Sequence, residues 1–241
     1  MASPLEQFTI VPIIDIEVAD IDISFTNSSL WMAITAAVLV IFMIVSTQRR
    51  ALVPGRMQAS AEYFYQIIAD MVRDNVGSQG RPYFPFIFSL FMFILFGNLL
   101  GLIPGAFTFT SHLAVTFAMA AFIFVGVTII GLAKHGFKFF SLFFPHGAPI
   151  VSAPVLIPIE IISYLSRPIS LSVRLFANML AGHTLLKVFA GFVISLGLVG
   201  GWLPLGFIVV LTGLEIIIAF LQAFVFAILT CLYLNDALHL H

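Results

Sequence analysis

Charged side chains are scarce in this sequence: Asp, Glu, Lys and Arg together make up 9% of its 241 residues, and the formal net charge is −1. A soluble domain carries about 25% charged residues, so this chain lacks the charge to cover a water-facing surface of its size. A net charge near zero without a basic patch also argues against nucleic acid as a partner. The hydrophobic share is 61% and the mean hydropathy is +1.14. This composition predicts an integral membrane protein.

Cysteine is nearly absent as well. Cys231 is the only one, which excludes disulfide frameworks and thiolate metal sites. The sequence contains no nucleophile triad, phosphate-binding loop or metal-ligand cluster, so we expect no cofactor and no metal. The chain by itself should make no chemical bonds.

Lysine and arginine are missing from residues 1–28, which hold five acids: Glu6, Asp15, Glu17, Asp20 and Asp22. A secretory signal needs a basic start, and a mitochondrial transit peptide is rich in arginine and poor in acids. We therefore expect neither, with a mature protein that begins near Met1. The apolar residues of the rest come in long blocks, which predicts one membrane domain over residues 1–241.

Three apolar segments have the length of about 20 residues that a membrane-spanning helix needs. They cover residues 30–47, 84–103 and 112–133. Residues 57–75 instead place apolar side chains at a helical period among charged ones, which predicts an amphipathic helix on the membrane surface. Residues 139–154 are interpreted as a re-entrant or interfacial loop because they contain Pro145, Gly147, Pro149 and Pro154.

The C-terminal part is too long for simple spans. Residues 155–198 are apolar and helix-like, and at about 1.5 Å per residue they extend about 65 Å, twice a hydrocarbon core of about 30 Å. A turn is predicted over residues 197–204, and a second helix over residues 205–234. Hydropathy leaves two alternatives open. The first stretch is either two perpendicular spans with a turn at Arg167-Pro168, or one arm of a long, steeply tilted helical hairpin.

The basic residues predict an orientation. With the spans as drawn, the following all fall on one side of the membrane: Arg49, Arg50, Arg56, Arg73, Arg81, Lys134 and Lys138. The acidic N-terminal segment falls on the other side. We therefore expect the N-terminus outside, in the periplasm or an equivalent space.

Ionisable side chains within the apolar blocks are functional candidates. Placing one at the centre of a membrane costs about 2.5–3.5 kcal/mol even on the insertion scales that give the lowest values. They all lie in the last two predicted helices, with two neutral polar companions: Glu160, Arg167, Arg174, Asn178, His183, Lys187, Glu215 and Gln222. A hairpin centred on Val199 predicts that His183 lies level with Glu215, Arg174 with Gln222, and Glu160 beside Asp236 and His239. At about 100° per residue, His183 and Arg174 occupy opposite faces of their helix.

Plainer interpretations exist for several of these residues. Arg167 and Lys187 fit interfacial anchors, and His183 with Glu215 could form a satisfied structural pair. Arg174 is different because no acidic residue lies level with it on the neighbouring helix. An unneutralised arginine facing lipid is untenable, so we expect its counter-ion to be a carboxylate on another chain.

The residues around Arg174 also carry a family resemblance. Residues 170–183, SLSVRLFANMLAGH, resemble the signature of the a subunit of F-type ATP synthases. Residues 221–226 (LQAFVF) and 229–234 (LTCLYL) are similar to its final helix, and residues 97–104 (GNLLGLIP) to its second-span motif. The resemblance covers residues 30–235. The acidic N-terminus looks alphaproteobacterial, and the positions of His183 and Glu215 are those of mitochondrial relatives.

The resemblance implies an all-α integral membrane protein whose last two helices form the tilted hairpin. It implies a stator subunit that provides two proton half-channels to a rotating ring of c subunits, and so couples proton flow to ring rotation and ATP synthesis. Arg174 would be the essential charge that faces the ring carboxylate, and His183 and Glu215 the relay of the outer half-channel. Asn178 and Gln222 would be polar neighbours of the arginine, and Glu160 a position of the inner half-channel.

The resemblance also implies partners and a location. The expected partners are the c-subunit ring, the b subunits of the peripheral stalk and the rest of the ATP synthase, in the bilayer of a bacterial inner membrane or, alternatively, of a mitochondrial inner membrane. The main competing function is a self-contained secondary transporter with an Arg–His–Glu core. Such proteins usually show internal repeats, whereas here the polar residues occupy the C-terminal third alone. A structural or assembly subunit with incidental charges is the third alternative.

Overall fold

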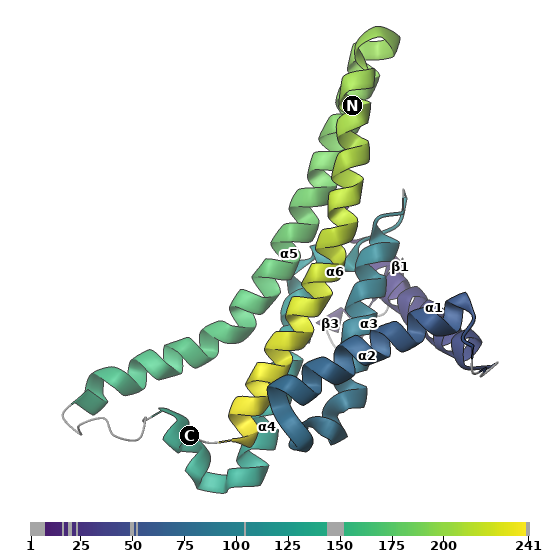
Figure 1. Cartoon of the computed structure of the whole chain (residues 1–241). Coiled ribbons are helices and arrows are strands. Elements are labelled where there is room, and N and C mark those ends of the chain that lie inside the picture. The colour runs from purple at the N-terminus through teal and green to yellow at the C-terminus, as the bar shows by residue number, and fades with distance from the viewer. Residues whose placement is uncertain are drawn as a thin grey trace.

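The computed structural model describes residues 8–15, 17–18, 21–22, 24–48, 51, 53–103, 105–143 and 152–239. Nearly all of this part is helical (Figure 1). The helices are α1 (Asn27–Gln48), α2 (Arg56–Val76), η2 (Gly77–Tyr83), α3 (Phe84–Gly101), η3 (Phe109–Ser111), α4 (Leu113–His135), η4 (Gly136–Phe143), α5 (Ala153–Gly200) and α6 (Trp202–Leu238). Five helical segments of the described chain are long and apolar enough to cross a membrane. The predicted all-α membrane fold is confirmed.

The N-terminal segment adds short strands that we did not predict. β1 (Pro12–Ile14) pairs with β4 (Phe25–Thr26), and β2 (Glu17–Val18) pairs with β3 (Ile21–Asp22), both antiparallel. The Asn27 side chain fastens this segment to the start of α1, since it donates to the Thr9 carbonyl at 3.0 Å and accepts from the Val11 amide at 3.3 Å. Some predictions fall outside the described residues: those for Glu6, Asp20, Arg49, Arg50, Pro104, Pro145, Gly147 and Pro149.

The amphipathic segment of residues 57–75 forms α2, which lies across α3 and α6 rather than alongside them (Figure 1). Its buried side chains recur at helical spacing on one face: Ala61, Ile68, Met71, Val72 and Val76.

Helix α3 is apolar on every side, as a helix surrounded by others must be, and packs against α1, α2 and α6. The small side chains of Ala219 and Ala223 on α6 are fully buried, which permits close helix contact.

The two alternatives for the C-terminal part are decided by α5. Its continuous part runs from Ala153 to Gly197, with Pro158 and Pro168 inside it, and α5 is kinked at Gly197, which adopts a φ of 61°. That positive φ is readily adopted by glycine, and α6 starts five residues later, within the predicted turn. A turn at Arg167-Pro168 is therefore excluded. At about 1.5 Å per residue, a helix of the 45 residues from Ala153 to Gly197 is too long to stand upright in a membrane.

The register of the hairpin changes along its length. A constant register would give the same sum of residue numbers for every pair that faces across it. Close to the turn Phe189 stacks on Phe207, and their numbers add up to 396. The sum is 398 for His183 with Glu215, and 403 for Arg167 with Asp236. Helix α5 curves away from α6 in its first half (Figure 1), as proline-containing helices do. The prediction of a constant register is therefore wrong at the end of the hairpin far from the turn, where Asp236 lies against Arg167 and not beside Glu160.

Candidate functional site

His183 and Glu215 meet across the hairpin, as the register near the turn predicts. The His183 Nδ1 atom lies 3.6 Å from Glu215 Oε1, and the two residues are only 8% and 5% exposed. Gly182 makes room for the carboxylate, because a methyl group there would overlap Oε1 and lie 3.1 Å from the carboxyl carbon. The pair thus depends on a glycine that precedes the histidine in α5.

The facing atoms of this pair are buried and unsatisfied. Neither His183 Nδ1 nor either Glu215 oxygen has a hydrogen-bond partner among the described residues. Buried polar atoms without a hydrogen bond are costly. The pair is therefore not a fully satisfied structural contact, and buried polar atoms of this kind call for a functional explanation.

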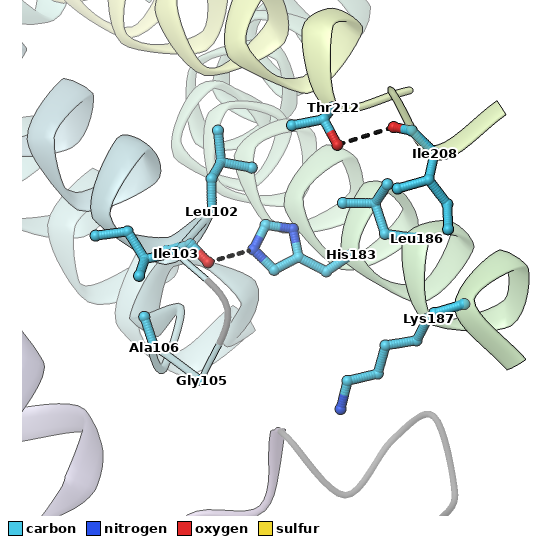
Figure 2. A pocket seen from close by; sticks show the side chains of 11 residues that line it. Leu102, Ile103, Gly105, Ala106, His183, Leu186, Lys187, Ile208 and Thr212 are labelled. Atoms are coloured by element: carbon cyan, nitrogen blue, oxygen red, sulfur yellow. Dashed lines mark hydrogen bonds between the residues drawn. The ribbon is translucent and has the colours of Figure 1, made fainter. Parts of the chain in front are cut away.

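The other side of the imidazole is bonded to the connection between α3 and α4. His183 Nε2 lies 2.7 Å from Thr108 Oγ1 and 3.0 Å from the Gly101 carbonyl oxygen; Figure 2 shows the carbonyl contact as a dashed line. Thr108 and Gly101 were not predicted from the sequence as partners of His183. The available signal was a run of hydroxyl side chains directly after an apolar span, Thr108, Thr110 and Ser111.

Asn98 ties this connection to the helix bundle. It is fully buried, accepts from the Thr110 hydroxyl at 2.8 Å and donates to the Ala219 carbonyl of α6 at 3.3 Å. The Gly97 Cα faces the Phe109 ring so closely that a methyl group would collide with it. These contacts fix residues 108–111 against α3 and α6, and so place Thr108 against the histidine.

A cavity of about 430 Å³ opens beside His183. Residues 101–103, 105 and 106 form one wall, and side chains of α5 and α6 form the other, including Lys187 and Thr212. Figure 2 shows the His183 ring directed into this space and the Lys187 side chain extending from the next turn of the same helix. Lys187, for which we favoured an interfacial anchor, therefore contributes a charge to the cavity that leads to His183.

Arg174 lies on the opposite face of α5, as the helix phase predicts. Its side chain is exposed, and it makes no hydrogen bond or ion pair with any residue that the structure describes. Asn178 and Gln222 are half-buried and likewise make no hydrogen bond within the described chain, so the predicted level pairing of Arg174 with Gln222 is not a direct contact. Glu160 is half-buried near the start of α5, away from the other candidates.

Arg167, in contrast, is satisfied within the chain. Its Nη1 atom donates to Asp236 Oδ2 at 2.8 Å. The guanidinium also lies over the rings of Tyr164 and Tyr233, at 5.3 and 5.1 Å from their centroids, which adds cation–π attraction. Arg167 thus joins the first half of α5 to the end of α6.

Comparisons with known proteins identify the family of the chain. A family model described as ATP synthase A chain matches residues 29–235. The ATP synthase subunit a of Rhodospirillum rubrum is 59% identical over 241 residues, which is the whole of both chains. Those of Paramagnetospirillum magneticum and Pelagibacter ubique are also 59% identical, the first over all of both chains and the second over 99% of this chain and 98% of the relative. The chain therefore belongs to the family of ATP synthase subunit a.

Proposed function

We propose that this chain forms two proton half-channels beside a rotating ring of c subunits, and that it couples proton flow to ring rotation. Membership in the family makes it a multi-pass subunit of the ATP synthase complex, in the proton-translocating membrane sector of a bacterial plasma membrane, and not an enzyme by itself. The proposal adds the residues that carry the proton and the partners they face.

The observation that carries the proposal is the buried His183–Glu215 pair beside an open cavity. Imidazole is the side chain whose ordinary charge change lies nearest neutral pH, and a carboxylate at 3.6 Å can exchange a proton with it after a small side-chain movement. The cavity reaches His183 from one end of the bundle. Together they form the relay of one half-channel.

The basic residues suggest which side the cavity faces. Lys134, at the far end of α4, donates to the Gln79 side chain and, at 3.1 Å, to the Leu238 carbonyl. Helix η2, which leads into α3, and the ends of α4 and α6 therefore lie together, at the opposite end of α4 from the cavity. Basic loops face the cytoplasm, so the cavity and the N-terminus face outward. Glu160, near the start of α5, then serves the inner half-channel.

Arg174 supplies a permanent charge between the two half-channels. A guanidinium does not deprotonate in proteins, and the exposed Arg174 makes no ion pair within the described chain. Its partner is the carboxylate of a passing c subunit, whose ionised form it stabilises at about 4–6 Å. Each ring site must therefore release its proton before it passes Arg174. Asn178 and Gln222 provide polar surface beside it, and the peripheral-stalk b subunits hold the stator against the ring.

Purified complex in proteoliposomes tests this assignment. His183→Ala and Glu215→Ala should each slow acid-driven ATP synthesis severely, whereas Glu62→Ala, on the exposed face of α2, should not. Arg174→Ala should abolish synthesis and allow passive proton flux. Normal synthesis in either relay variant would refute the relay. Proton transport by this chain alone, in vesicles without partners, would favour the secondary transporter instead.

A further inference from the structure

The contacts of His183 Nε2 define which ring nitrogen holds the proton in the neutral histidine. Nε2, the Thr108 hydroxyl oxygen and the Gly101 carbonyl oxygen form a closed triangle with sides of 2.7, 3.0 and 3.2 Å. Thr108 is 3% exposed, so water does not replace these contacts readily. The hydroxyl brings one hydrogen to this triangle, and Nε2 brings either a second hydrogen or a lone pair. The carbonyl oxygen can only accept.

For a neutral ring, only one arrangement makes all three contacts hydrogen bonds. The Thr108 hydroxyl donates its single hydrogen to the Gly101 carbonyl, so its oxygen is free to accept from the ring. Nε2 must then carry a hydrogen, which points between the two oxygens. A bare Nε2 would place its lone pair 3.0 Å from the lone pairs of the carbonyl oxygen, which is repulsive.

We propose that Thr108 and the Gly101 carbonyl hold neutral His183 as its Nε2–H tautomer, so that the proton it exchanges is carried on Nδ1, facing Glu215. Thr108 is then a positioning residue, since it acts through His183. That the exchanged proton belongs to the transport path rests on the function proposed above; the tautomer itself does not.

The tautomer determines the route of the proton. A protonated Glu215 gives its hydrogen to the lone pair of Nδ1, which leaves a carboxylate and an imidazolium with both nitrogens protonated. The reverse step restores the Nε2–H tautomer. The Nε2 hydrogen stays in place throughout, so the proton enters and leaves on the Nδ1 side and does not pass through the ring from one nitrogen to the other.

The surroundings of Thr108 keep the arrangement rigid. A methyl group at Gly101 would lie 2.6 Å from Thr108 Oγ1 and 2.8 Å from its Cγ2, so the threonine side chain is seated directly against the glycine. Ser111 donates to the Thr108 carbonyl at 2.6 Å and fixes the backbone on the other side. The hydroxyl therefore has one available direction, toward Gly101 and His183.

Nitrogen NMR of the assembled complex tests the tautomer directly. The complex is labelled with ¹⁵N-histidine and placed in lipid nanodiscs, and the His183 signals are assigned by their loss in His183→Gln. Protonated and bare ring nitrogens resonate far apart, so the tautomer can be read without any transport assay. The variants are Thr108→Val, which keeps the shape without the hydroxyl, and Thr108→Ser, which keeps the hydroxyl. Thr230→Val is the matched control, because Thr230 is equally buried and its hydroxyl bonds to the Phe226 carbonyl of its own helix.

We expect the unchanged chain, Thr108→Ser and Thr230→Val to show Nε2–H alone in the neutral form. Thr108→Val should show both tautomers and lose about 10-fold or more in acid-driven ATP synthesis, which Thr108→Ser should restore. An Nδ1–H tautomer in the unchanged chain, a permanently doubly protonated ring, or a Thr108→Val variant with unaltered signals would each overturn the proposal. Full synthesis by His183→Ala alongside an Nε2–H signal would instead refute the relay and leave the tautomer standing.

Discussion

Gly182→Ala should separate the activity of the protein from its stability. The added methyl group would overlap Glu215 Oε1 and lie 3.1 Å and 3.2 Å from the next two atoms of that side chain, whereas carbon contacts are ordinarily about 3.5–4.0 Å. The obstructed atoms belong to the end of a flexible side chain rather than to backbone. The carboxylate can therefore turn away without displacing α5 or α6.

The size of each effect follows from this geometry. The carboxylate must move by about 1 Å to relieve the overlap, and a misplacement of that size at a reacting centre costs about 100-fold in rate. Stability should not fall, since alanine is more favourable than glycine within a helix by about 1 kcal/mol. We therefore expect acid-driven ATP synthesis to fall by about 10- to 100-fold, while the amount of assembled complex and its Tm stay equal or rise.

Two further variants make this experiment decisive. Gly126→Ala in α4 is the control, because a methyl group there meets nothing within 4 Å, and it should leave synthesis unchanged. The second is the double variant Gly182→Ala with Glu215→Asp, in which the obstructed side chain is one methylene shorter. This double variant should synthesise ATP faster than Gly182→Ala alone. Full synthesis in Gly182→Ala, at normal complex levels, would show that the position of Glu215 does not limit proton transfer.

Three other substitutions test the remaining parts of the site in the same proteoliposomes. The double variant His183→Glu with Glu215→His, which exchanges the two side chains, should recover part of the synthesis lost in each single variant, since the two side chains face each other. A double variant no better than the worse single one would contradict the pairing. Arg174→Lys should lose synthesis almost as completely as Arg174→Ala, because an ammonium that the c ring shields from water can release its proton, which a guanidinium cannot. Near-normal synthesis by the lysine variant would refute the need for a permanent charge. Arg167→Gln should lower the free energy of unfolding by about 1 kcal/mol or less through loss of the partly exposed Asp236 contact, and so lower the Tm, with synthesis per assembled complex unchanged; a loss of synthesis at normal Tm would give Arg167 a role in transport.

Hydropathy and helix phase alone predict much of this structure. The spans over residues 30–47, 84–103 and 112–133 correspond to α1, α3 and α4, because apolar composition over about 20 residues is a local property of the chain. The opposite faces of Arg174 and His183 follow from 3.6 residues per turn. The pairing of His183 with Glu215 follows from the turn near Gly197, since a short distance from a turn leaves little room for the register to drift.

Other features were decided by the tertiary structure. Two prolines within α5 are compatible with a break or with a curved helix, and the curvature moves Asp236 from Glu160 to Arg167. Thr108 and His183 are 75 residues apart in sequence, and their meeting depends on how the chain folds back after α3. The need for a glycine at position 182 likewise arises only because Glu215 lies opposite it in the folded chain. The periodicity of a helix encodes which side is apolar, whereas the neighbour of a given side chain depends on how separate helices cross, which no single segment encodes.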